Sequence, residues 1–331
     1  MQLAIESTSK IHVATTLADP LNLSITSVGM VAEQQLNGVR QAQVLAAFER
    51  SFYVKTETGL FCVGLPEIGC GPLNALLASE QQGLPVNIVS GELLLISNQK
   101  IFLADGHEID ASQASVYHGE NCFATPSADI LIQNRRDIKA LQGMPEEGFF
   151  WLIDKHKLCA KESAVQSALR SSCTASLSGL LDCLQTGFAD VSVASDKYYD
   201  ASAALGLVGA GPGLTPAGDD VIAGVMLALA RFQRTDLVNS IWHAIAPDLP
   251  SQTNSISAAH LEQAAKGYCG KAMNDLMSEI FLAQKIEVDT LGAVLNGMGC
   301  TSGWDTLAGV AMVIDAWQHS LNTIHRTVTT C

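Results

Sequence analysis

The spacing of apolar residues changes part-way along this chain, and that change limits the fold more than any other feature. Up to about residue 125, short apolar runs alternate with turn residues, which is typical of β-strands. From about Leu158 onward, apolar residues recur every three or four positions, the period of packed helices. The chain has 331 residues, enough for two ordinary domains. We therefore predict an α+β protein with a β-rich domain over residues 1–150 and an all-helical domain over residues 151–331.

In the N-terminal half, the segment from Ser51 to Leu65 predicts a hairpin, because Gly59 can supply the positive φ that a tight turn needs. The segment from Val86 to Leu103 predicts three short β-rich runs broken by turn residues. Between them, Gly69 to Ser79 (GCGPLNALLAS) fits either the start of a helix or a corner between strands. Whether these strands close into a barrel stays open at this point.

In the C-terminal half, glycine and proline gather at a few positions and leave long helical stretches between them. The boundary between the halves is expected from Ala124 to Phe149, a polar connection that contains proline. The predicted helices are Ala160 to Gly187, Tyr198 to Leu207, Asp219 to Phe232, Leu237 to Ala246, Ser257 to Lys266, Gly270 to Leu282, Asp289 to Met298 and Asp305 to Ser320.

Composition argues against several classes of protein. There are 33 Asp and Glu against 19 Lys and Arg, a net charge of -14, and no basic cluster that could neutralise a nucleic-acid backbone. The longest apolar stretch, Val221 to Ala230, is too short to cross a bilayer, and the chain does not start with a signal-peptide pattern. The 9 cysteines form no CxxC pair, which indicates reduced thiols. We expect a soluble, cytoplasmic protein that binds neither nucleic acid nor membrane.

The most informative stretch is GAGPGLTPAGDDVIAG, from Gly209 to Gly224. It predicts a tight loop that leads onto a helix N-terminus, where free amides and the helix dipole favour an anion. In one interpretation, Asp219 caps the helix and Asp220 complements its dipole. In the other, the loop binds an anionic ligand and the two carboxylates bind a metal or a ligand amine. The loop residues that would then bind the ligand are Gly211, Gly213, Thr215 and Gly218, with Asp219.

A second stretch, from Gly299 to Gly309, repeats the end of the first. Both contain G-x-D-x-[IL]-A-G and both precede a strongly apolar helix. We infer that two buried helices pack with their N-termini close together, so that Asp220 and Asp305 are matched residues. Chance similarity between two capped helices is the alternative. If the two motif helices pack in this way, Thr301, Ser302 and Gly303 contribute to the same binding site as Thr215.

The stretch from Thr253 to Gly267 supplies a third set of candidates. Ser257 is placed to cap a helix and to contribute a hydroxyl to the site. His260 is the acid-base candidate, because an imidazole titrates near neutral pH. The alternative is that His260 is a hydrogen-bonded structural residue.

The motifs GLTPAGDDVIAG, TNSIS...LEQAAKG and GCTSGWDTLAG, with GPLN in the β half, resemble a bacterial family of undefined function. One member type is the small third subunit associated with the oxamate carbamoyltransferase complex of allantoin catabolism. The resemblance runs from about residue 10 to 320. It implies a role in an assembly that converts oxalurate and phosphate into oxamate and carbamoyl phosphate, or the reverse. Family members commonly have Ser where this chain has Ala217, so that hydroxyl is absent here.

The leading hypothesis is therefore a subunit of a carbamoyltransferase-like complex. Its partners would be a small anionic substrate, such as carbamoyl phosphate or an oxamate-like molecule, and the other subunits. Backbone amides would hold the anion, Asp220 and Asp305 would orient the carbamoyl amine or a metal, and His260 could move a proton. No cofactor is certain, and Mg²⁺ is the metal that carboxylates would bind. The alternatives are a non-catalytic subunit that docks on a larger protein, and a free-standing Asp/Mg-dependent hydrolase or phosphotransfer enzyme.

Overall fold

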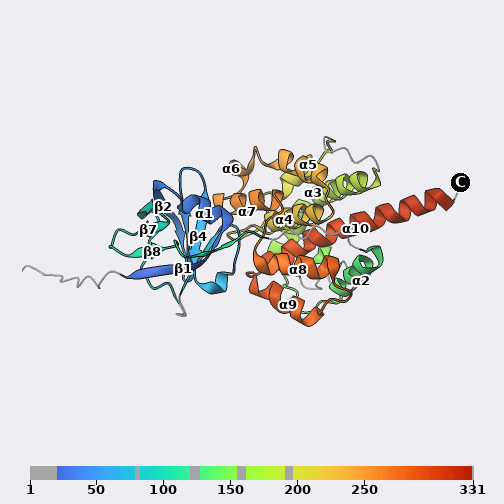
Figure 1. The fold of residues 1–331 in the computed structure, drawn as a ribbon. Coiled ribbons are helices and arrows are strands. Elements are labelled where there is room, and N and C mark those ends of the chain that lie inside the picture. The colour runs from blue at the N-terminus through green and yellow to red at the C-terminus, as the bar shows by residue number, and fades with distance from the viewer. Residues whose placement is uncertain (1–20, 79–82, 120–126, 155–161, 191–196, 330–331) are drawn as a thin grey trace, which may run out of the picture.

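The structure is a computed structural model that describes residues 21–78, 83–119, 127–154, 162–190 and 197–329, and side chains up to residue 323. Figure 1 shows two parts side by side, a β-sheet wrapped into a barrel and a bundle of helices. The predicted α+β class, with strands first and helices second, is confirmed.

The described strands form a nine-stranded sheet in the order β5-β4-β3-β2-β6-β7-β8-β1-β9. An additional antiparallel pairing between β1 and β5 closes eight of them into a ring, while β9 pairs in parallel with the second half of β1. The sequence left open whether the strands close into a barrel, and the structure shows that they do. The strands are β1 (Asn22–Gly29), β2 (Val39–Ala47), β3 (Ser51–Lys55), β4 (Leu60–Gly64), β5 (Asn74–Leu77), β6 (Leu93–Ser97), β7 (Lys100–Phe102), β8 (Glu108–Asp110) and β9 (Ser115–Tyr117).

The barrel has its own apolar core, built by alternation along the strands. On β6, Leu94 and Ile96 are buried inside, whereas Leu93 and Leu95 face outward. Helix α1 (Met30–Leu36) adds Leu36 to the same core. The strands and α1 therefore form the interior of the β half without the helices of the C-terminal half.

The predicted hairpin is confirmed as β3 and β4, whose turn is closed by a 2.9 Å hydrogen bond from the Thr56 amide to the Gly59 carbonyl. The positive φ expected at Gly59 was wrong, because this turn forms without it. Of the three β-rich runs predicted between Val86 and Leu103, the last two are β6 and β7. The first is not a strand, because Pro85 lacks an amide hydrogen and Gly91, at φ +90°, turns the chain before a ladder can form. The part of the Gly69 to Ser79 segment that the structure describes, up to Ala78, is a corner leading into β5: the Asn74 side chain donates to the Gly69 carbonyl across 2.9 Å.

Two described helices of the helical half were not predicted from the sequence, a short one over Leu249–Gln252 and a longer one over Ala128–Lys139. Helix α2 (Ala128–Lys139) lies within the segment expected to be a polar connection, and it buries Leu131 and Ile138 in the core of the helical half. Its buried face also includes Asn134 and Arg135, so polar residues interrupt the apolar stripe that would have marked a helix. The other described helices are α3 (Ala164–Ala189), α4 (Ala217–Arg231), α5 (Thr235–Ile245), α6 (Leu249–Gln252), α7 (Ser255–Ala265), α8 (Lys271–Leu282), α9 (Val288–Gly297) and α10 (Ser302–Thr329).

The helix predicted from Asp305 to Ser320 is longer in the structure and runs from Ser302 to Thr329. Two other predicted helices also need correction. The segment predicted as a helix from Tyr198 to Leu207 is a 3₁₀ turn, η4 (Ser202–Leu207). Helix α7 begins before Ser257, because the Asn254 side chain accepts hydrogen bonds from the amides of Ile256 and Ser257 and so caps the helix. Within the described residues, no helix has the length and apolar character needed to span a bilayer.

The two halves meet along α7 and the start of α8. Ile256 of α7 packs on the outer face of the β3–β4 hairpin, against Tyr53 and Leu60. The Lys271 amide donates to the Cys70 carbonyl across 2.7 Å, so the Gly69–Asn74 corner is fastened to α8. The described cysteines are free thiols, as predicted; they are Cys62, Cys70, Cys173, Cys183, Cys269 and Cys300, while Cys122, Cys159 and Cys331 lie outside the described residues.

Candidate functional site

The helices that carry the matched motifs, α4 and α10, cross in direct backbone contact. A Cβ atom added at Gly224 would lie 2.0 Å from the Thr306 carbonyl oxygen, and one added at Gly309 would lie 2.1 Å from the Val221 carbonyl oxygen. Neither position has room for a side chain. The inference that the two motif helices pack together is confirmed, and the glycine of each motif is what permits the contact.

This crossing brings the N-termini of both helices together. The hydroxyls of Thr215 and Ser302 lie 2.8 Å apart, which joins the loop before α4 to the first residue of α10. Asp220 lies close enough to Asp305 for the charge of Asp305 to raise the pKa of the Asp220 carboxyl group. The structure thus unites Asp220, Asp305, Thr215 and Ser302, as the sequence predicted; we call these four residues the acid pair site.

Asp305 is completely buried at this site. Its Oδ1 atom accepts a 2.5 Å hydrogen bond from the Phe149 amide, and its Oδ2 atom is buried with no hydrogen-bond partner among the described residues. Burial raises the pKa of Asp305 to about 7, although the Phe149 amide and the Thr301 hydroxyl act in the opposite direction. Asp305 is therefore poised to change its charge near neutral pH.

Asp220 has a similar environment. Burial raises its pKa well above the usual value, the Asp305 charge raises it further, and the hydroxyls of Ser302 and Thr215 lower it. Its Oδ2 atom is also buried without a partner in the described part of the chain. Both carboxyl groups therefore favour the protonated form more than an exposed aspartate does, and at Asp220 the Asp305 charge adds to the effect of burial.

Asp219 lies next in sequence but has a different role. Its Oδ1 atom accepts from the Gly209 amide at 2.7 Å, and its Oδ2 atom accepts from the hydroxyls of Thr253 and Ser257 at 2.5 and 2.6 Å. These bonds tie the loop before α4 to α7. Asp219 does not cap α4, whose N-cap residue is Pro216, and the Ser257 hydroxyl predicted for the site is engaged by Asp219 instead.

Residues 207–314 match the family model of the oxamate carbamoyltransferase subunit AllH.

The match spans both glycine-aspartate motifs and leaves the β-barrel outside it. The resemblance inferred from those motifs is confirmed over these residues, about a third of the chain. No solved structure matches the chain.

The glycine-rich loop within the AllH match is tight, as predicted. Gly211 and Gly213 have φ values of +105° and +113°, in the left-handed region that favours glycine. Some amides in the first turn of α4 already have acceptors: the Gly218 amide donates to the Ala210 carbonyl and the Asp219 amide donates to the Pro216 carbonyl. In the first turn of α10 the Asp305 amide donates to the Thr301 carbonyl at 2.8 Å, and no acceptor is found in the described structure for the amides of Ser302, Gly303 and Trp304. The N-terminus of α10 is therefore the freer of the two.

Two glycines predicted to bind a ligand have a packing role in the structure. A Cβ atom on Gly218 would lie 2.1 Å from the Leu207 carbonyl oxygen, and one on Gly303 would lie 2.6 Å from that of Leu295. The lack of a side chain at each glycine allows its helix to approach a neighbouring segment of backbone. Ligand binding by their amides stays a prediction.

His260 lies on α7, one turn after Ser257, and is half-buried. Burial lowers its pKa to about 4, so the imidazole is neutral at pH 7. No hydrogen bond between His260 and the acid pair is found in the described structure. Its role in proton transfer therefore stays a prediction.

Sequence analysis missed three residues that shape the site: Gly148, Phe149 and Gln166. Phe149 donates its amide to Asp305, and the Gln166 side chain bonds both the amide and the carbonyl of Gly148, at 2.9 and 2.7 Å. Nothing in the local sequence marks them, because a lone glycine in a connection and a glutamine early in a helix are common.

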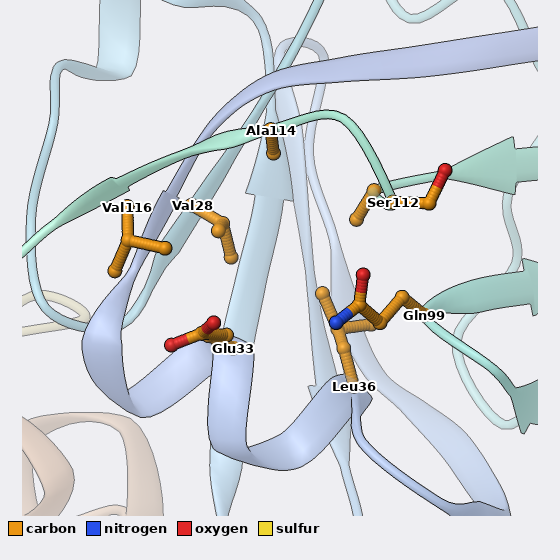
Figure 2. A pocket seen from close by; sticks show the side chains of 8 residues that line it. Val28, Glu33, Leu36, Gln99, Ser112, Ala114 and Val116 are labelled. Carbon is orange, nitrogen blue, oxygen red and sulfur yellow. The ribbon is translucent and has the colours of Figure 1, made fainter.

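The described residues contain no group of three or more His, Cys, Asp or Glu side chains placed to hold a metal ion. Two cavities lie elsewhere. One, of about 120 Å³, lies between α1 and the chain around β9; Figure 2 shows Glu33, Gln99 and Ser112 among its lining residues. The other, of about 520 Å³, lies between the β3–β4 hairpin and α5–α7, with Trp242 and Leu249 in its wall.

Proposed function

We propose that this chain is a subunit of a carbamoyltransferase assembly that acts on oxamate or oxalurate and carbamoyl phosphate, and that the acid pair site binds its small ligand. The match to AllH supports the first part. The second part rests on one observation: both Asp220 and Asp305 have a buried oxygen without a partner in the described residues, where two helix N-termini converge. A buried acceptor without a donor is costly, and a ligand N–H would satisfy it.

The two ends of such a ligand call for different partners. The N-terminus of α10 and the hydroxyls of Thr215 and Ser302 favour a phosphate or carboxylate group. The carboxyl pair repels an anion but accepts hydrogen bonds from a carbamoyl –NH₂ group. The proposed arrangement therefore places the anionic end against α10 and the amide end against Asp220 and Asp305. This local polarity acts against a chain charge of -14, which on its own would slow anion approach.

Ligand binding to the purified chain tests this function directly. Carbamoyl phosphate, phosphate, oxamate and oxalurate, each with and without Mg²⁺, are compared by thermal unfolding. A ligand at a hundredfold excess over its Kd stabilises the folded chain by about 2.7 kcal/mol, which raises Tm by several degrees. Asp220→Asn should abolish that rise, because an amide group changes both the charge and the acceptors of the pair.

The control is Asp289→Asn, which removes one exposed carboxylate from the first turn of α9 and should keep the ligand response. A Tm that none of the four compounds raises would contradict the binding proposal. So would a rise that is equal in Asp220→Asn and in the unmodified chain.

A second candidate function, docking on another subunit without catalysis, is favoured by an uncovered apolar surface. Val39 on β2 is 71% exposed, and Leu93 and Leu95 on β6 are 68% and 45% exposed. Antiparallel pairing places Leu95 opposite Gln41 and Leu93 opposite Gln43, so apolar and uncharged polar residues alternate on this outer face. Lys55 on β3 and Lys100 on β7 stand at its borders. We call Val39, Leu93 and Leu95 the β2–β6 patch. An apolar patch of this kind suits contact with a partner subunit of the same assembly.

Replacing both Leu93 and Leu95 by Ser should weaken binding to the co-expressed partner subunits at least tenfold, about 1.4 kcal/mol, while the chain stays folded. Binding is measured by titration after size-exclusion purification. Val165→Ser, a change at a 64% exposed position on α3, controls for lost surface apolarity. Equal affinity of the double variant and the control would rule out the β2–β6 patch as the docking surface.

A further inference from the structure

A short buried segment crosses directly over Asp305. The Phe149 amide donates to Asp305 Oδ1 across 2.5 Å, and a Cβ atom added at Gly148 would lie 2.4 Å from Oδ1 and 2.8 Å from Oδ2. Gly148 has a φ of +88°, which side chains other than glycine rarely adopt. We call Gly148 and Phe149 the Asp305 strap. Its backbone lies so close to the carboxyl group that any movement of the strap would also move Asp305 or change its hydrogen bonding.

Gln166 holds this strap from the other side. Its Oε1 atom accepts from the Gly148 amide at 2.9 Å, and its Nε2 atom donates to the Gly148 carbonyl at 2.7 Å. Gln166 is only 2% exposed and lies in the first turn of α3, where the Ser163 hydroxyl accepts from its backbone amide. Both ends of its side-chain amide are therefore committed to one residue of the strap.

The second strap residue is fixed by packing. The Phe149 ring is fully buried in the core of the helical half, with the Trp151 ring centroid 6.2 Å away. The strap is thus held by hydrogen bonds at Gly148 and by apolar contacts at Phe149. Both restraints reach Asp305 through the single amide of Phe149.

The groups around Asp305 leave few other ways to fix its orientation. Asp220 is its acidic neighbour, Asp219 is engaged by Gly209, Thr253 and Ser257, and the nearby hydroxyls belong to Thr215, Thr301 and Ser302. On the adjacent α2, Arg135 is engaged by the Asp315 carboxylate and by the carbonyls of Leu152 and Ile153. The Phe149 amide is the backbone donor that reaches Asp305.

We propose that Gln166 is a positioning residue for Asp305: it holds the strap so that Oδ1 is occupied by the Phe149 amide and Oδ2 is left for Asp220 and the ligand. Gln166 acts through Gly148 and touches neither Asp305 nor a substrate in this arrangement. The ligand part of this inference rests on the proposed function. The positioning part concerns only the chain itself and can be tested without any ligand.

The test is the pH dependence of stability in Gln166→Met, which keeps the side-chain length but removes both hydrogen bonds to Gly148. Free energies of unfolding in urea from pH 4 to pH 8 give the midpoint at which the native chain loses the proton of the acid pair. We expect the midpoint to shift by at least about half a pH unit, a threefold change in proton affinity. Loss of the Phe149 hydrogen bond alone raises the midpoint, because that bond favours the ionised carboxylate. Entry of water lowers the midpoint, because water also solvates the carboxylate, so a shift in either direction supports the proposal.

Gln35→Met is the matched control. Gln35 is a buried glutamine of α1 that accepts hydrogen bonds from the hydroxyls of Thr56 and Thr58, far from the acid pair in the barrel half. The Gln35→Met change should lower the free energy of unfolding at every pH and leave the midpoint unchanged. If Gln166→Met also lowers stability with an unchanged midpoint, Gln166 has only a structural role and the proposal is overturned. Gln166→Asn, which keeps the amide but withdraws it by one methylene, is measured by the same criterion in case the methionine variant does not fold.

The ligand result separates this inference from the function on which part of it rests. If the midpoint shifts and carbamoyl phosphate, phosphate, oxamate and oxalurate bind neither the variant nor the unmodified chain, Gln166 positions Asp305 and the proposed ligand function is wrong. If a ligand binds the unmodified chain and the midpoint does not shift in the variant, the function stands and the positioning role is wrong.

Discussion

Gly309→Ala should destabilise the chain by about 3 kcal/mol, although the same change inside an ordinary helix is stabilising by about 1 kcal/mol. The reversal follows from the crossing of α4 and α10, where a Cβ atom on Gly309 would lie 2.1 Å from the Val221 carbonyl oxygen and 2.8 Å from the Val225 amide nitrogen. These neighbours are backbone atoms of a buried helix, so they cannot move aside as a flexible side chain would. The helices must separate, and apolar contacts along the crossing are lost.

The measurement is the free energy of unfolding in urea at a fixed pH. Gly297→Ala is the control, because Gly297 is a helical residue of α9 with no atom outside its own surroundings within 4 Å of the added Cβ. That change should be neutral or slightly stabilising. If Gly309→Ala were as stable as Gly297→Ala, the backbone contact between α4 and α10 would be wrong, and with it the geometry of the acid pair site.

This crossing is also the part of the site that the sequence predicted best. In each motif the aspartate precedes the glycine by four residues, so one helical turn separates them along the same face. When the faces bearing Gly224 and Gly309 meet, the aspartates are carried to the same end of the crossing. Two copies of one pattern therefore predicted a tertiary contact, which neither copy alone could do.

The strap over Asp305 shows why the rest of the site could not be predicted. Gly148 and Gln166 lie far from Asp305 in sequence, and their roles come from a backbone path between α2 and α3 rather than from a motif. The barrel shows the same limit. Local alternation predicted the β3–β4 hairpin, but closure depends on pairing between β1 and β5, which lie about fifty residues apart, as in Ile25 opposite Leu77. Pairings of such long range leave little trace in local periodicity.

Asp219 illustrates a different difficulty. The sequence predicted that Asp219 either caps α4 or binds the ligand beside Asp220, since both occur in the first turn of α4. Adjacent helical residues point about 100° apart, so one carboxylate faces Thr253 and Ser257 while the other faces α10. The choice between a structural and a chemical role thus depended on what packed against each face, which the helix itself does not specify.

Asp305→Asn should reduce the pH dependence of stability and make the chain more stable than the unmodified protein above pH 7. In the unfolded chain the carboxyl group has a pKa of 3.8, and burial raises the pKa to about 7 in the native chain. The native state therefore binds this proton more tightly than the unfolded state. The stabilisation is complete below pH 4 and is lost as pH rises through about 7. The difference corresponds to roughly 4 kcal/mol for this fully buried group.

An asparagine at this position resembles the protonated acid, because its carbonyl can accept from Phe149 and its –NH₂ group can donate toward Asp220. Urea unfolding at intervals from pH 4 to pH 8 should give a steep decline for the unmodified chain and a shallower one for the variant. A residual slope is expected from Asp220, whose pKa is also raised by burial. Asp289→Asn removes one negative charge from the chain elsewhere and should leave the decline due to Asp305 in place. Equal slopes in Asp305→Asn and the unmodified chain would show that Asp305 is ionised in the native protein across this range. A buried Asp305 without a neighbouring cation would not stay ionised over this range, so the burial of Asp305 could not then explain its behaviour.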